Sequence, residues 1–399
     1  MKRPLHLLCL GQILLSCGCA QHFSTGLDRL EADGLSALKG RRVGVVTNPT
    51  GVDRELKGLP ELVAAAPGAT LVALFGPEHG ASGASGAGDP VANARDKKTG
   101  VPVYSLYGAS RRPTTDMLQG IDLLLFDIQD VGVRAYTYAS TLVEVLAAAA
   151  ENRVEVWVLD RPLPAGHVVE GPVLEEGLRS FVGAHTVPLR YGLTMGEFAR
   201  MVNEELRLGA SLRVFSMGGY RRDLPFEATG LVWIAPSPNI PTVDTAVLYS
   251  GMVLVEGTNL SEGRGTTRPF HLVGAPWVDG EALAAKLVAY GFPGCAIRPA
   301  RFIPSASKYE GEECSGVEIH VTDRSSLRAV ALAVALFESV RSLHPDKFKI
   351  HAEGFDKLAG TPTLRESIES EKPLREILAS WERGIAKYLA RRSKFLLYP

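Results

Sequence analysis

The chain has 399 residues, of which 46% are hydrophobic and 22% are charged, a composition typical of a folded globular protein. Its formal net charge is −1, so it lacks the basic field that nucleic-acid binding requires. At this length we expect two domains rather than one compact core.

Residues 1–20 have the pattern of a secretory leader. Lys2 and Arg3 precede the apolar stretch Leu5 to Leu15, which is too short to span a bilayer and is followed by small residues. The tetrapeptide that ends at Cys17 also resembles a bacterial lipobox, in which Cys17 would be acylated. We therefore expect an exported protein of the periplasm or cell envelope. It would contact the membrane only through a lipid on Cys17, and simple cleavage is the alternative.

From residue 24 to residue 248, apolar β-branched runs alternate with helical segments. Short apolar strands separated by helices are typical of an α/β domain whose parallel sheet is covered on both faces. One helix is expected over Ser140–Asn152, and another begins at Thr194, which fits a capping box with Glu197. The expected strands are Arg42–Thr47, Thr70–Phe75, Val101–Leu106, Ile121–Ile128, Val154–Asp160, Leu212–Phe215 and Leu231–Ile234.

Residues 249–399 are expected to form a second, smaller α/β domain. The mixed run Thr245–Val255 leads into it, and the Gly-rich loop Glu256–Thr267 follows. Cys295 and Cys314 could pair in an oxidising compartment or remain buried free thiols. The other expected elements are helices over Gly280–Tyr290, Ser326–Leu343 and Pro373–Arg392, and a strand over Gly316–Thr322.

Ionisable and amide side chains follow four of the expected strands. Ligands of parallel α/β sheets bind at this edge, because the loops after the strands converge there. Glu78 is the sharpest candidate: it lies between Pro77 and His79 and opens a loop of small residues, where a carboxyl can be desolvated and its pKa raised. The other candidates at these strand ends are Asn48, Asp127, Gln129, Asp130, Arg134, Tyr136, Asp160, Arg161 and Glu170.

Several of these side chains have a purely structural alternative. Glu78 could cap a helix, and Asp127 and Asp130 could cap the turns that follow their strand. The adjacent Asp160 and Arg161 could belong to a structural ion pair.

A second set of polar residues begins at Asn239 and continues through the loop Glu256–Thr267. Its amide, hydroxyl and charged groups suit a polyhydroxylated ligand, and the planar fork of Arg264 suits a carboxylate. A phosphate loop or a tight turn is the alternative, although neither the P-loop nor the dinucleotide pattern is satisfied. The remaining candidates in this loop are Glu256, Asn259 and Glu262.

Five motifs resemble those of the exo-β-N-acetylmuramidase family, in order along the chain from Gly26 onward. They differ from the common pattern at the Ala81–Gly86 loop and at Leu163. The motifs are Thr47-Asn48-Pro49-Thr50-Gly51, Gly76-Pro77-Glu78-His79-Gly80, Phe126 to Arg134, Pro236-Ser237-Pro238-Asn239 and Glu256 to Thr267.

The resemblance implies a Rossmann-like domain over residues 24–248, a smaller α/β domain over residues 249–399, and an active site in the cleft between them. It also implies release of terminal N-acetylmuramic acid from the non-reducing end of peptidoglycan fragments, with Glu78 as a catalytic residue. No nicotinamide or other cofactor is implied.

The resulting hypothesis is glycoside hydrolysis of peptidoglycan-derived muramyl saccharides. Glu78 would be the general acid, and Asp127, Asp130 or Glu170 the second carboxylate. Arg134 or Arg264 would bind the lactyl carboxylate. Substrate contacts would come from Asn48, His79, Gln129, Tyr136, Asp160, Arg161, Asn239, Glu256, Asn259 and Glu262.

Two rival functions remain open at this stage. One is a non-catalytic sugar-binding lipoprotein of the cell wall. The other is a metal-assisted hydrolase that uses Glu78, His79, Asp127 and Asp130, although the sequence shows no strong metal-ligand spacing. The oligomeric state and the stereochemical course of hydrolysis are left undecided.

Overall fold

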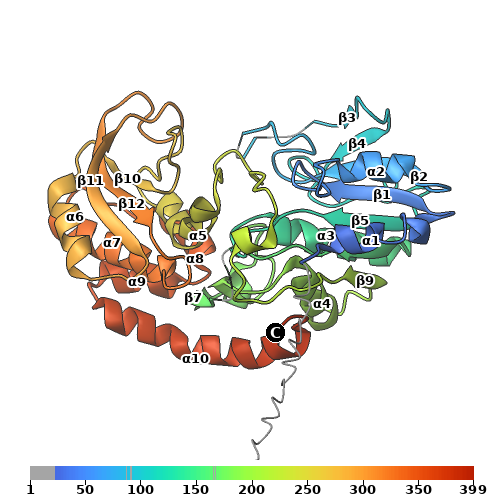
Figure 1. The fold of residues 1–399 in the computed structure, drawn as a ribbon. Helices are drawn as coiled ribbons and strands as arrows, with labels where there is room; N and C mark the ends of the chain where they lie inside the picture. The colour runs from blue at the N-terminus through green and yellow to red at the C-terminus, as the bar shows by residue number, and fades with distance from the viewer. Residues whose placement is uncertain (1–22, 87, 90–91, 165, 167) are drawn as a thin grey trace, which may run out of the picture.

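The structure is a computed structural model that describes residues 23–86, 88–89, 92–164, 166 and 168–399. The predicted leader, including Cys17, for which a lipid was predicted, lies outside the described residues. The described part of the chain forms two lobes (Figure 1). Within that part, no helix combines the length and the apolar character needed to cross a membrane.

The N-terminal lobe is built on a seven-stranded sheet of order β3-β4-β2-β1-β5-β6-β9, which is parallel except where β3 pairs with β4. The predicted parallel α/β fold is thus confirmed. Chain order reverses direction at β1, which pairs with both β2 and β5. The strands are β1 (Arg42–Thr47), β2 (Thr70–Gly76), β3 (Ala94–Arg95), β4 (Pro102–Ser105), β5 (Leu123–Asp127), β6 (Glu155–Leu159) and β9 (Leu212–Phe215).

Both faces of this sheet are covered, because alternate side chains of each strand point to opposite sides. In β5, Leu123 and Leu125 pack with the apolar cluster of α1 and α2, whereas Leu124 and Phe126 pack with that of α3 and α4. Thr194 caps α4 through the predicted box with Glu197. The helices are α1 (Gly26–Glu31), α2 (Leu59–Ala65), α3 (Tyr138–Asn152) and α4 (Met195–Glu205).

One sequence prediction in the middle of the chain is wrong, and one segment for which no element was predicted is a helix. Leu231–Ile234 is not a strand but an extended loop. The mixed run Thr245–Val255 is mostly the buried helix α5 (Val243–Met252), since its apolar residues are buried on all sides rather than alternately. Periodicity alone does not separate a short buried strand from a buried helix.

The C-terminal lobe contains a smaller antiparallel sheet of order β10-β12-β11. Its strands are β10 (Leu272–Ala275), β11 (Cys295–Phe302) and β12 (Cys314–Val321), and α6 (Gly280–Ala289) and α7 (Ala329–Leu343) pack beside them. Cys295 and Cys314 are both free thiols. Cys295 lies opposite Val321 and Cys314 opposite Phe302, so the two thiols occupy opposite ends of the strand pair.

The chain returns from the C-terminal lobe to the N-terminal lobe. After α8 (Ala352–Ala359) and α9 (Pro362–Glu369), the long helix α10 (Leu374–Arg392) runs beneath both lobes (Figure 1). It packs on the hairpin of β7 (Glu170–Val173) and β8 (Pro188–Arg190). The Tyr388 hydroxyl donates to the Tyr191 carbonyl at 2.7 Å. One apolar core extends through both lobes, so their relative position is fixed by packing.

Candidate active site

A cleft of about 760 Å³ lies where the two lobes meet, within the size range of small-molecule sites. Residues from both lobes line it. The N-terminal lobe contributes Glu78, His79, Asp89, Tyr107, Tyr136, Thr137 and Asn239. Helix α5 and the residues after it contribute Tyr249, Glu256, Glu262, Arg264, Phe270 and Lys308.

Glu78 is presented to this cleft by the turn that ends β2. Its Oε2 accepts a hydrogen bond from the Thr137 hydroxyl at 2.6 Å, and its Oε1 accepts one from the Gly88 amide at 3.0 Å. His79 has a left-handed backbone, with φ of 71°, and its Nδ1 lies 2.8 Å from the Ser85 carbonyl. These contacts hold the small-residue loop after Glu78 against the base of the turn, so the carboxyl group has a defined position.

The opposite wall carries alternating charges. Arg264 lies between two carboxylates: its Nη2 is 2.8 Å from Glu256 Oε1 and its Nε is 3.3 Å from Glu262 Oε1. Lys308 Nζ lies 3.1 Å from Glu262 Oε2 and donates to the carbonyls of Val255, Glu256 and Leu260. Glu262 is buried, whereas Glu256 is half-buried. Burial raises the pKa of Glu256, Arg264 opposes that rise and Glu262 adds to it.

Aromatic side chains join the two walls. The ring centroid of Tyr249 lies 5.6 Å from that of Tyr136 and 4.9 Å from that of Phe270, both in edge contacts. Burial raises the pKa of Tyr249, and the charges of Glu256 and Glu78 raise it further. A single tyrosine therefore lies within electrostatic reach of carboxylates on both walls. All three rings are buried, so this end of the cleft is closed.

Seven of the predicted site residues line the cleft. The two sequence regions singled out, the end of β2 and the loop after Glu256, do face each other there. The seven are Glu78, His79, Tyr136, Asn239, Glu256, Glu262 and Arg264.

The three residues predicted to supply the second carboxylate do not line the cleft. Asp127 is completely buried and pairs with Arg161, with Arg161 Nη2 2.8 Å from Asp127 Oδ2. Asp130 Oδ2 accepts from the Gly132 amide and the Tyr191 hydroxyl. Glu170 Oε1 accepts from an amide in the first turn of α7. Protein groups bind at least one oxygen of each of these carboxylates away from the cleft, which points to structural roles, and their predicted catalytic role is not tested.

Asp130 gives the folded protein a specific pH dependence. Burial raises its pKa from 3.8 to about 6, so the folded state holds this proton more tightly than the unfolded chain. Its contribution to the free energy of unfolding is therefore largest below about pH 4 and is lost as pH rises through 6. The free energy of unfolding can be measured with urea at pH 4.5 and at pH 7. We expect it to fall less between these two pH values in Asp130→Asn than in the unmodified protein. An equal decrease in the two proteins would contradict the raised pKa of Asp130.

Six further predicted residues also hold the fold instead of lining the cleft. Arg134 donates to three carbonyls, those of Pro172, Val187 and Leu358, and so ties the two lobes together. It is therefore not available for the lactyl carboxylate. The others are bound within the protein as follows: Asn48 to Tyr138 and Thr50, Gln129 to the Asp130 and Pro162 carbonyls, Asp160 to Thr194 and Gly196, Arg161 to Asp127, and Asn259 to Lys347 and Lys349.

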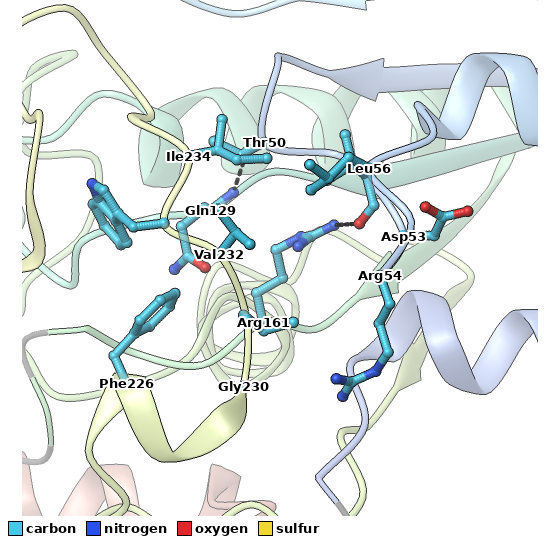
Figure 2. A pocket seen from close by; sticks show the side chains of 13 residues that line it. Thr50, Asp53, Arg54, Leu56, Gln129, Arg161, Phe226, Gly230, Val232 and Ile234 are labelled. Carbon is cyan, nitrogen blue, oxygen red and sulfur yellow. Dashed lines mark hydrogen bonds between the residues drawn. The ribbon is translucent and has the colours of Figure 1, made fainter.

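Gln129 and Arg161 line a separate, much smaller pocket at the point where strand order reverses. Arg161 Nη2 donates to the Val52 carbonyl at 2.9 Å, and Figure 2 shows the backbone N–H of Gln129 bonded to the Thr50 hydroxyl. This pocket has a volume of only about 50 Å³, which is too small for a sugar ring. Ligands of open α/β sheets commonly bind at this position, but here protein side chains fill it.

Sequence reasoning missed several residues of the cleft. Tyr107 follows β4, which pairs with β2. It lines the cleft, so the rule that ligands bind after parallel strands also applies to this strand. Thr137 lies directly beside the predicted Tyr136. Lys308 belongs to a loop without any motif, and only the folded chain brings it to Glu262. Among the described residues, no three His, Cys, Asp or Glu side chains are grouped as a metal site would require.

Comparison with known proteins gives matches along nearly the whole chain. The family model described as "Exo-beta-N-acetylmuramidase NamZ, N-terminal" matches residues 43–244, and its C-terminal counterpart matches residues 247–398. The two matches meet inside α5, near the boundary predicted at residue 249. The peptidoglycan beta-N-acetylmuramidase NamZ of Bacillus subtilis (strain 168) is 44% identical over 376 residues, which are 94% of this chain and 91% of that protein.

Two solved structures of DUF1343 family proteins from Bacteroides fragilis share the fold. One has a TM-score of 0.88 at 37% identity and covers 95% of this chain and 99% of its own. The other has a TM-score of 0.78 at 30% identity, with coverage of 94% and 99%. The resemblance seen in the motifs is therefore confirmed, and the chain belongs to the exo-β-N-acetylmuramidase family.

Proposed function

We propose that this protein is an exo-acting glycosidase that releases terminal N-acetylmuramic acid from the non-reducing end of peptidoglycan fragments. Its family membership supports this activity, as does the named activity of the Bacillus subtilis relative. The observation that carries the proposal is the cleft in which Glu78 faces a wall bearing Glu256, Glu262 and Arg264. Most glycoside hydrolases use a pair of carboxyl groups that flank the scissile bond.

In this proposal Glu78 protonates the glycosidic oxygen. The Thr137 hydroxyl beside it can donate to an ionised carboxylate or accept from a protonated one, so this contact persists in both protonation states of a general acid. The Gly88 amide fixes the other oxygen of the carboxyl group. Glu78 can therefore lose and regain its proton without moving.

Glu256 takes the place of the second carboxylate in the proposal. It is half-buried in the opposite wall, whereas Glu262 beside it is buried between Arg264 and Lys308. Glu256 would activate water or stabilise the oxocarbenium-like transition state. Arg264 would supply the positive charge for the lactyl carboxylate, and His79 and Asn239, which line the same cleft, would contact sugar hydroxyls.

We expect Glu256→Gln to lower kcat by about 10²- to 10⁴-fold while the protein remains folded, because the amide cannot act as a base or carry the stabilising charge. Rate measurements with and without added azide check this role, since azide can replace a missing carboxylate. Full activity of Glu256→Gln without azide would exclude Glu256 from the reaction.

A single assay tests the proposed function: release of the chromophore from a chromogenic β-muramide by the purified protein. Absence of turnover would favour a sugar-binding lipoprotein instead, and loss of turnover with a chelator would favour metal-assisted hydrolysis. Family membership favours neither rival.

The proposal also includes export. The charged and apolar pattern of residues 1–20 supports secretion to the cell envelope, and the lipobox-like tetrapeptide supports a lipid on Cys17. The mass of the mature N-terminus distinguishes acylated Cys17 from simple cleavage.

A further inference from the structure

A stacked group of side chains lies at the rim of the cleft, beyond Glu78. The Arg111 guanidinium lies 4.6 Å from the ring centroid of Phe181 and 5.9 Å from that of Tyr107. The two rings are 6.0 Å apart and tilted by 49°. Tyr107 and Val182, which is next to Phe181, both line the cleft, so the rim is continuous with it.

Local hydrogen bonds fix both loops that form this rim. Ser105 and Ser110 each bond with their side chain to the backbone two residues later, which orders the loop from the end of β4 to residue 112. On the other side, Ser180 and Gly183 exchange two backbone hydrogen bonds, of 3.1 and 3.0 Å, across a tight turn with Phe181 and Val182 at its tip. The rim is therefore formed before any ligand binds.

Arg111 carries a charge that the described residues do not neutralise. No described carboxylate lies within ion-pair distance of it, whereas the adjacent Arg112 pairs with Glu151 at 2.5 Å. Arg111 is exposed, and Phe181 and Tyr107 are half-buried. Two half-exposed aromatic faces under a planar cation are suited to an acidic saccharide, because rings pack on sugar faces and a guanidinium forks onto a carboxylate.

The position of the rim relative to Glu78 decides which part of a substrate would reach it. Burial raises the pKa of Tyr107, and the neighbouring Glu78 raises it further whereas Arg111 lowers it. Tyr107 is therefore the member of the rim that interacts with both the proposed proton donor and Arg111. The rings of Tyr136, Tyr249 and Phe270, which also line the cleft, are buried, whereas Arg111 is exposed. A terminal sugar would lie against the buried rings, so the departing saccharide would extend across the exposed rim.

We propose that Arg111, Phe181 and Tyr107 form a subsite for the departing saccharide, in which Arg111 binds a carboxylate borne by that saccharide. This inference rests on the proposed function. Peptidoglycan offers two sources of that group: the free lactyl carboxylate of the next muramic acid, and the carboxylates of a peptide stem attached to it. The chemistry recognised is the same in both.

Three substrates separate the possibilities. The first is the disaccharide of muramic acid and glucosamine (both N-acetylated), whose departing sugar is neutral. The second is a trisaccharide with a further muramic acid that has a free lactyl carboxylate. The third is the same trisaccharide with a short peptide on that lactyl group. Kinetic constants are measured for each with the unmodified protein, Arg111→Met, Phe181→Leu and the matched control Arg112→Met.

We expect Arg111→Met to raise KM roughly three- to tenfold for the acidic substrates, as loss of an exposed ion pair would, and to leave the neutral disaccharide within about twofold. Phe181→Leu should show the same selective loss, because the guanidinium loses its platform. Arg112→Met removes the same charge one residue away and should change none of the three. A larger effect on the trisaccharide with the free lactyl group, or on the peptide-bearing one, identifies the source of the carboxylate.

Equal effects of Arg111→Met on all three substrates, or none, would overturn the subsite. Turnover of the neutral disaccharide by the unmodified protein tests the proposed function independently. If no substrate is hydrolysed, the proposed function itself is wrong and the subsite falls with it. If all are hydrolysed but Arg111→Met does not discriminate among them, only the subsite is wrong.

Discussion

Replacing Glu78 with Gln is expected to lower kcat/KM on a muramyl disaccharide by about 10²- to 10⁴-fold, the range that one general acid contributes. The amide keeps the shape of the side chain: its oxygen can still accept from the Gly88 amide, and its NH2 group can donate to the Thr137 hydroxyl oxygen, so the loop after Glu78 should stay in place. The loss would thus be chemical rather than structural. Initial rates measure the loss of activity, and a thermal melting curve of the same preparation shows whether the fold is kept.

The leaving group shows whether Glu78 acts as the proton donor. A nitrophenol departs without protonation, so Glu78→Gln should lose much less activity on a nitrophenyl β-muramide than on the disaccharide. Asp53→Asn in the small pocket removes a carboxylate from a place that cannot hold a sugar, and it should leave both rates unchanged. Activity of Glu78→Gln close to that of the unmodified protein on both substrates would remove Glu78 from the mechanism.

The substitution Arg161→Met is expected to have the largest effect on stability. It leaves the fully buried carboxylate of Asp127 without its cation, and removal of one partner from a buried pair typically costs about 3–5 kcal/mol. Burial already raises the pKa of Asp127 although Arg161 opposes this, so the group would tend to take up a proton when left alone. Urea unfolding followed by circular dichroism measures the loss.

A double variant also tests whether Asp127 and Arg161 form a structural ion pair. Asp127→Leu combined with Arg161→Met removes both charges, and much of the lost stability should return, because apolar residues often replace a buried ion pair at little cost. The Val52 carbonyl would still lack the donor that Arg161 provides. If the single variant instead kept its stability but lost turnover, the pair would belong to the chemistry and the structural assignment would be wrong.

Comparing Glu78 with Asp127 explains why only part of the predicted set of site residues lines the cleft. Glu78 and Asp127 both follow apolar strands, and their neighbours in the sequence do not show which partner each carboxylate meets in the folded chain. Asp127 is turned into the fold because Arg161, from the end of the neighbouring β6, bonds to it. Glu78 follows β2, where the loop after the neighbouring β4 carries Tyr107, and both side chains line the cleft. Which partner satisfies a charge depends on contacts between distant segments.

The sequence by itself determined most strands of the parallel sheet, most of the longer helices and the family, because apolar periodicity, capping boxes and long motifs are local properties of the chain. It also identified the two segments, around Glu78 and around Glu256 to Arg264, that meet in the cleft. Only the tertiary structure decided which polar side chains face that cleft and which hold the fold. Arg134 bonds to three carbonyls from different parts of the chain, and Lys308 reaches Glu262 from a loop without a motif. The free energy of a buried charge is set by partners that folding alone brings together.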